Sequence, residues 1–156
     1  MTYIADLAEW DPLGPSNGRV LAVGWLEPGH DYTRGEASPE FFCALVALLV
    51  KPWQPFAAAG RHRCPFCRFT GGPTELRHEG AVVQLGSANL FVPGDGCVFV
   101  APSMAAHYVD AHEYSPPAEF QRAVLSCPPM RSMEYLRRLR ELGAHRLGAG
   151  SWGTPG

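Results

Sequence analysis

Four residues of the sequence have the types and the spacing of a metal site: Cys64, Cys67, His107 and His112. The cysteines form a Cys-x-x-Cys pair. Two such thiolates can bind one ion because the chain between them turns back and directs backbone N–H groups at the sulfurs, and Pro65 favours that turn. Two imidazoles from a distant segment would complete the tetrahedron that Zn²⁺ prefers. The sequence therefore predicts one Zn²⁺ ion bound by all four side chains.

The spacing of the two histidines predicts a distortion of the helix that carries them. The number of residues between His107 and His112 lies within the range of about three to five that is seen for paired zinc histidines. On a regular α-helix, however, side chains five positions apart point about 140° away from each other. Both imidazoles can reach one ion only if the helix loosens in its last turn. The approach to Pro116 gives a reason for such an ending.

The flanking sequence argues against redox and deaminase chemistry. Residues 64–67 are similar to the active-site sequence of glutaredoxins, which needs its first cysteine at a helix N-terminus. Residues 68–73 end in Gly-Gly-Pro, so no helix is expected there. A zinc deaminase needs His-x-Glu before its cysteine pair, whereas the His-Glu pairs of this chain come after it, at His78 and His112. Four protein ligands leave no open position, so the site is expected to be structural.

The other histidines and cysteines are less suited to this site. His62 is the best substitute ligand, and it is otherwise expected to be exposed or to donate a hydrogen bond to a ligand. Cys97 lies in a predicted strand and is a weaker alternative. Cys43 is expected in the core. His30, His78 and His145 are expected on the surface.

The chain between and around these residues predicts an α+β fold. Residues 20–26 are apolar on both faces, as in a buried central strand. A buried helix is predicted to begin at Ser38, which can cap it, with Pro39 in the first turn and an end at Lys51-Pro52. Three or four short strands are predicted, at 74–78, 81–85, 88–92 and 97–100, with the spacing of an antiparallel meander.

Three further helices are predicted in the C-terminal part. The first carries His107 and His112, and the second begins after Pro117. The third runs from about Ser132 to Leu142, with four residues expected to point inward: Tyr135, Leu136, Leu139, Leu142. We expect one zinc-stabilised domain over residues 1–143, stapled by the Cys2His2 site, and a Gly-rich tail over residues 144–156.

Composition and charge limit the classes of protein to consider. The chain has 156 residues, a net charge of −2 and 18% charged residues, which predicts no overall attraction to nucleic acid or membrane. The N-terminus lacks the features of a secretory signal, and the longest apolar run, 41–50, is too short to span a membrane. Five cysteines with one close pair favour metal binding over disulfides. A cytoplasmic location is expected.

Several linked motifs resemble those of a family of small uncharacterised bacterial proteins. They are Gly60-x-His62-x-Cys64-x-x-Cys67, Val92-Pro93 before a glycine-rich turn, and His107-Tyr108-x3-His112-x-Tyr114-x-Pro116-Pro117. The resemblance covers roughly residues 3–125. It implies a zinc site at Cys64, Cys67, His107 and His112, and it implies no activity.

The function predicted from these features is binding without catalysis. We expect a zinc-binding domain that acts on a protein partner as an accessory or immunity-like factor, because the sequence contains no nucleophile–base pair and no phosphate-binding loop. The alternative is a nucleic-acid-binding module, because Arg61, Arg63 and Arg68 flank the metal loop together with Phe66 and Phe69. The simpler expectation is that these phenylalanines pack beneath the loop. A zinc-dependent hydrolase is the least favoured function.

Overall fold

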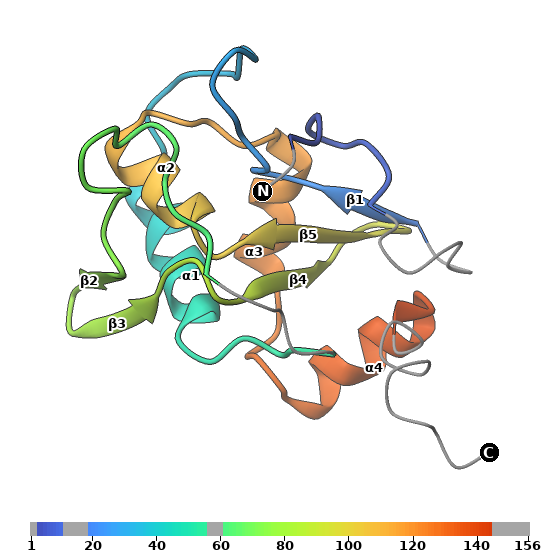
Figure 1. The fold of residues 1–156 in the computed structure, drawn as a ribbon. Helices are drawn as coiled ribbons and strands as arrows, with labels where there is room; N and C mark the ends of the chain where they lie inside the picture. The colour runs from blue at the N-terminus through green and yellow to red at the C-terminus, as the bar shows by residue number, and fades with distance from the viewer. Residues whose placement is uncertain (1–2, 11–18, 56–60, 145–156) are drawn as a thin grey trace.

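A computed structural model describes residues 3–10, 19–55 and 61–144 of the chain. Its nine elements follow one another as shown in Figure 1: β1 (Val20–Ala22), α1 (Pro39–Leu49), β2 (Glu75–His78), β3 (Ala81–Gln84), β4 (Asn89–Pro93), β5 (Val98–Pro102), α2 (Ala105–Ala111), α3 (Ala118–Ser126), α4 (Met133–Glu141). The predicted mixture of helices and short strands is confirmed.

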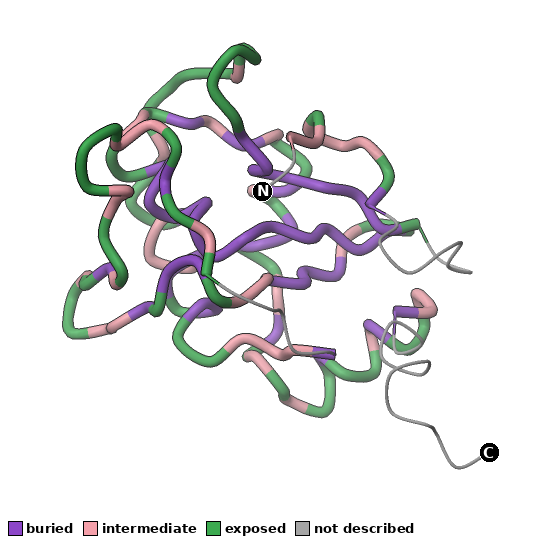
Figure 2. Tube along the Cα trace, viewed as in Figure 1, coloured by how far each residue is buried: buried purple, intermediate pink, exposed green. Residues whose placement is uncertain are grey.

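The centre of the fold is a three-stranded sheet with the order β1-β5-β4. β5 runs antiparallel to β4, with Val100 opposite Phe91, and parallel to β1, with Phe99 opposite Leu21. All five residues of β5 are buried, and Figure 2 shows burial along nearly the whole of β4 and β5. β5, and not the apolar segment at 20–26, is therefore the central strand.

Alternate residues of this sheet point into two separate cores, because successive side chains of a strand lie on opposite faces. Leu21, Val92 and Phe99 pack in the core formed with α1, α2 and α3. Phe91 and Val100 pack in the core formed with α4 and residues near the N-terminus. The three earlier helices thus lie on one side of the sheet and α4 lies on the other (Figure 1).

Residues 4–10 cover the outer edge of β1. The pairs Ile4–Trp25 and Glu9–Leu21 form isolated antiparallel bridges, so the edge strand keeps its backbone hydrogen bonds. Gly24, with a φ of 80°, follows the strand, and its N–H donates to the Asp6 carboxylate at 3.0 Å. Burial of this segment agrees with the sequence prediction, but its place at the centre of the sheet was wrong.

The strands between residues 75 and 102 form two hairpins and not one continuous meander. β2 pairs with β3 and β4 pairs with β5, in two separate sheets. The chain between the hairpins forms other hydrogen bonds: the Gly86 N–H donates to Ser103 Oγ at 2.9 Å, and its carbonyl accepts from the His62 N–H at 2.8 Å. These bonds attach the chain between β3 and β4 to the loop of Cys64 and Cys67 and to the start of α2. The strand pairing therefore does not continue from one hairpin to the next.

The starts of α1 and α4 agree with the sequence prediction. Ser38 accepts a hydrogen bond from the Phe41 N–H at the start of α1, and Ser132 accepts one from the Tyr135 N–H at the start of α4. In α4, Tyr135 and Leu139 are buried as predicted, but Leu136 is 41% exposed, which corrects its predicted inward position.

The first residue of the predicted tail is part of the fold. Ala144, placed in the predicted tail, is buried in the same core as α4, whereas residues 145–156 lie outside the described part of the chain. None of the described helices has the length and apolar character needed to cross a membrane.

Alkaline pH is expected to destabilise the fold through Cys127, which packs between the two cores. Burial raises the pKa of its thiol from 9.0 to about 11, against a smaller opposing effect of Arg138. The unfolded chain therefore ionises first, and the contribution of this thiol to stability is complete below about pH 9 and is lost as the pH rises to about 11. Thermal melts across this range should show a falling melting temperature. The fall should be shallower in Cys127→Ala; equal slopes would contradict the assignment.

Candidate metal centre

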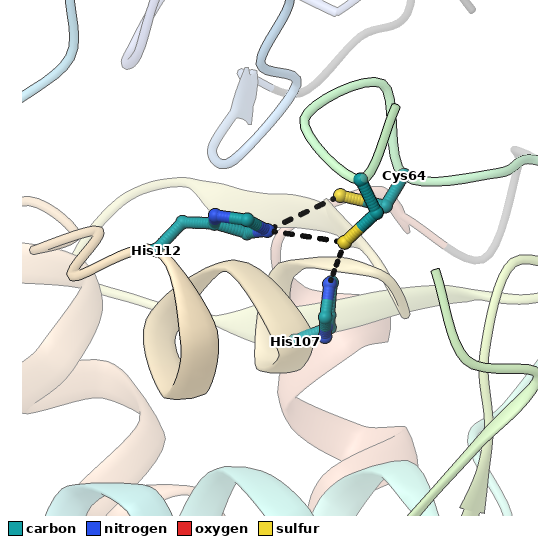
Figure 3. Close-up of side chains that lie close together, drawn as sticks. Cys64, His107 and His112 are labelled. Atoms are coloured by element: carbon teal, nitrogen blue, oxygen red, sulfur yellow. Dashed lines mark hydrogen bonds between the residues drawn. The ribbon is translucent and has the colours of Figure 1, made fainter. Parts of the chain in front are cut away.

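The four predicted ligands form one group, and Figure 3 shows Cys64, His107 and His112 pointing toward one another. Nε2 of His112 lies 3.4 Å from Sγ of Cys64 and 3.6 Å from Sγ of Cys67, and Nε2 of His107 lies 3.4 Å from Sγ of Cys67. Sulfur and nitrogen bound to one zinc ion at tetrahedral angles would lie about 3.6 Å apart, given bonds of about 2.3 and 2.1 Å. All four ligand atoms lie within 4.8 Å of one another, so this group could hold a metal ion.

The cysteine loop is closed by backbone hydrogen bonds and not by a helix. The Cys64 N–H donates to the Gly71 carbonyl at 2.7 Å, and the Gly71 N–H donates to the Cys67 carbonyl at 2.8 Å. Residues 61–74 are all described and contain only turns and bends, so the helix that a glutaredoxin-type cysteine needs does not form. The prediction that no helix follows Cys67 is therefore confirmed.

The electrostatics of Cys64 favour a cation at the centre. Burial raises the pKa of its thiol to about 11, and the neighbouring Cys67 adds to this effect. Backbone N–H groups of Phe66 and Cys67 act in the opposite direction because they donate to the sulfur, as the Cys-x-x-Cys turn predicts. The effect of these donors on the pKa is smaller than that of burial. A bound metal ion would lower the pKa further, because a coordinating thiol is deprotonated.

The end of α2 brings the second histidine to the site. His107 lies within α2, whereas His112 follows it with φ −121° and ψ 16°, outside helical geometry. Glu113 then adopts a positive φ of 55°. The N–H groups of His112 and Tyr114 both donate to the Tyr108 carbonyl, at 3.0 and 3.1 Å. Helical geometry therefore ends before His112, as the five-residue spacing of the two histidines requires.

Both imidazoles are in a state that suits coordination. Burial lowers the pKa of His107, and the neighbouring His112 lowers it further. Burial also lowers the pKa of His112, with an additional effect of Arg34. Neutral imidazole is the form that binds metal, so both rings can present a nitrogen lone pair near neutral pH.

Aromatic side chains enclose the site on the side of Phe66. The Phe66 ring lies 5.3 Å from the His112 ring, 5.7 Å from that of Tyr108 and 5.6 Å from that of Tyr32, measured between centroids. Tyr32 also donates its hydroxyl to the His112 carbonyl at 2.9 Å. These contacts fix the backbone and the ring of His112. Phe66 thus packs beneath the loop as expected, whereas Phe69, expected there as well, is fully exposed.

The alternative ligands lie outside this group. His62 and Cys97 do not belong to it. The His62 N–H instead anchors the metal loop to Gly86, and burial lowers the pKa of its imidazole. His30 stacks on Tyr3, with ring centroids 3.8 Å apart. His145 falls outside the described residues.

The structure also brings together a second group that the sequence analysis did not predict: Cys43, His78 and Glu79. Cys43 was expected in the core and His78 on the open surface, but both are half-buried and in contact with each other. The period of the helix could have indicated the position of Cys43. Cys43 lies two positions after the fully buried Phe41 and so points to nearly the opposite side of α1.

Comparison with known proteins identifies a family but no activity. The family model of a domain of unknown function (DUF7919) matches residues 2–125. This range includes all four residues of the candidate metal centre and ends before α4. No curated protein and no solved structure matches the chain.

Proposed function

The chain belongs to this family of unknown function, and we propose that it is a non-enzymatic, zinc-stabilised domain that binds a protein partner through its metal loop. The observation that carries the proposal is the position of Phe69. Its side chain is 101% exposed, two residues beyond Cys67 in a loop held by the metal centre. Aromatic residues, phenylalanine among them, are enriched at protein interfaces relative to the rest of the protein surface.

The ligand set supports zinc as the metal. Two thiolates and two imidazoles match the structural zinc sites of proteins, whereas magnesium and calcium prefer oxygen ligands. Zinc bound here would join the loop of Cys64 and Cys67 to the end of α2. Four protein ligands would fill its tetrahedron and leave no position for a substrate. The role of the ion would be to hold the loop that presents Phe69.

A second candidate function is nucleic-acid binding by the same loop. Arg61, Arg63 and Arg68 are all exposed, and none forms an ion pair with another described residue. They lie in the same segment of the chain as Phe69, which could stack on a base. The protein partner is favoured because the chain has a net charge of −2, which gives no general attraction to phosphates.

Phe69→Ala is expected to abolish partner binding without changing stability. The exposed ring contributes little to the fold, so the free energy of unfolding should change by less than about 0.5 kcal/mol. The measurement is affinity capture from an extract of the source organism with the metal-loaded protein, followed by titration of the captured partner. Met133→Ala, at an 86% exposed side chain on α4, is the matched control and should keep full binding.

Two outcomes would contradict this proposal. The first is a partner that binds Phe69→Ala as tightly as the unaltered protein. The second is salt-dependent binding of an oligonucleotide that is lost when Arg61, Arg63 and Arg68 are replaced together by alanine, which would establish the second candidate function in its place.

A further inference from the structure

A second group of metal-binding side chains lies between α1 and the β2–β3 hairpin. Sγ of Cys43 is 3.4 Å from Nε2 of His78 and 3.4 Å from Oε2 of Glu79. Nε2 of His78 is 4.0 Å from the same Glu79 oxygen. Ligands of one zinc ion at tetrahedral angles would lie about 3.3–3.6 Å apart for these atom types. We propose that Cys43, His78 and Glu79 form a second site for a divalent metal ion, with three protein ligands.

The direction of the three side chains distinguishes this site from a catalytic triad. In a cysteine hydrolase, the acidic residue contacts the ring nitrogen that faces away from the nucleophile, so the three groups form a chain. Here Cys43 and Glu79 both face Nε2 of His78, and Glu79 also contacts the sulfur directly. The three groups therefore surround one point. This convergence is the arrangement of a ligand set.

Two elements fix the positions of these ligands. Glu79 and Gly80 form the two-residue connection of the hairpin and have positive φ values of 47° and 84°, the conformation of a type I′ turn. The turn projects His78 and Glu79 toward α1. The ring of Phe42 packs edge-on against His78, with centroids 4.8 Å apart, and so orients the imidazole. The site is thus built on an ordered hairpin and an ordered helix.

The charges around the site favour a cation. Glu40 lies one helical turn before Cys43, and its charge acts on the Cys43 thiol together with that of Glu79. Among the described residues, neither glutamate forms an ion pair with an arginine or a lysine. Partial burial and these two carboxylates raise the pKa of the Cys43 thiol, which makes it a poor nucleophile in the absence of a metal ion.

The ligand types indicate which ions would bind. A thiolate, an imidazole and a carboxylate suit Zn²⁺ and Co²⁺ and do not suit Mg²⁺ or Ca²⁺. Three protein ligands leave a fourth position for water or for a ligand from outside the chain. Glu79 is exposed and Cys43 is half-buried. The ion would therefore exchange more readily than one held by Cys64, Cys67, His107 and His112.

The proposal is tested by titrating Co²⁺ into full-length protein that already holds one equivalent of Zn²⁺. A second equivalent should bind with a sulfur-to-cobalt charge-transfer band. Cys43→Ser should lose this band and the second equivalent, and both His78→Gln and Glu79→Gln should weaken its binding. His30→Gln is the matched control and should behave as the unaltered protein. All variants should keep the first equivalent and their melting temperature, which shows that they fold.

Absence of a second equivalent in the unaltered protein would overturn the proposal and leave the three side chains as a hydrogen-bonded group only. Undiminished binding by Cys43→Ser would overturn it as well. If the chain binds a single equivalent of cobalt, and its band depends on Cys43 and not on Cys64, this site would be supported and the centre at Cys64 would be contradicted. The two assignments can therefore fail separately.

Discussion

Replacing Cys64 with serine, or His107 with alanine, is expected to remove the bound zinc and to lower the melting temperature by about 10–20 °C. Both residues are buried, and the zinc that they would share joins the cysteine loop to α2. Because ligand geometry of this kind does not exist in the unfolded chain, the free energy of metal binding is part of the free energy of folding. A loss of about 5 kcal/mol corresponds to this shift, at about 2–4 °C per kcal/mol for a chain of this size.

Elemental analysis and thermal melts of the purified variants check this prediction. Cys97→Ser is the matched control, because Cys97 is also a buried cysteine but lies outside the group of four. It should keep the metal content of the unaltered protein. Full metal retention in both Cys64→Ser and His107→Ala would show that the assignment of the ligands is wrong.

Gly72→Ala is expected to destabilise the protein by about 3 kcal/mol and to weaken metal binding. Gly72 has a φ of 81°, and a Cβ there would lie 2.6 Å from Cβ of Cys64 and 3.6 Å from Nε2 of His107. Any non-glycine residue costs about 1–2 kcal/mol in this backbone region. The added methyl group must also displace Cys64 from its position, at a further cost of about 1–3 kcal/mol.

Gly80→Ala provides the control for Gly72→Ala, because it has nearly the same backbone strain without the contact. Gly80 has a φ of 84°, and a Cβ there would meet no atom within 4 Å. Chemical denaturation should show a smaller loss in Gly80→Ala, of about 1–2 kcal/mol. In protein that holds one equivalent of zinc, competition with a chelator should show weakened binding in Gly72→Ala alone. Equal losses in both variants, with unchanged zinc affinity, would mean that Gly72 does not support the centre.

The two halves of the candidate centre could be predicted from the sequence because the constraints on each half are local. The Cys64–Cys67 turn, the closing glycines after it and the spacing of His107 and His112 each depend on a few neighbouring residues. The departure of His112 from α2 follows from the same spacing and from helix geometry. The caps at Ser38 and Ser132 are local signals of the same kind.

The features that the sequence analysis missed depend on contacts between distant segments. The parallel pairing of β1 with β5 joins residues 20–22 to residues 98–100, and no pattern within either segment specifies that partner. The break between the two hairpins arises from hydrogen bonds of Gly86 to His62 and Ser103. These are tertiary effects that override the regular spacing of the strands.

Two errors of side-chain placement have a similar origin. Cys43 was placed in the core because its neighbours in sequence are apolar, but the β2–β3 hairpin packs beside it and supplies polar partners. Leu136 was placed inward together with Tyr135, Leu139 and Leu142, but α4 buries only a narrow stripe on the sheet. In both cases the side of the helix that is covered depends on elements far away in the sequence.

X-ray absorption at the zinc edge, on protein that holds one equivalent of zinc, tests the central assignment most directly. Coordination by Cys64, Cys67, His107 and His112 predicts two sulfur ligands at about 2.3 Å and two nitrogen ligands at about 2.0–2.1 Å. A first shell with fewer than two sulfurs, or with a water oxygen in place of one imidazole, would contradict a closed structural site.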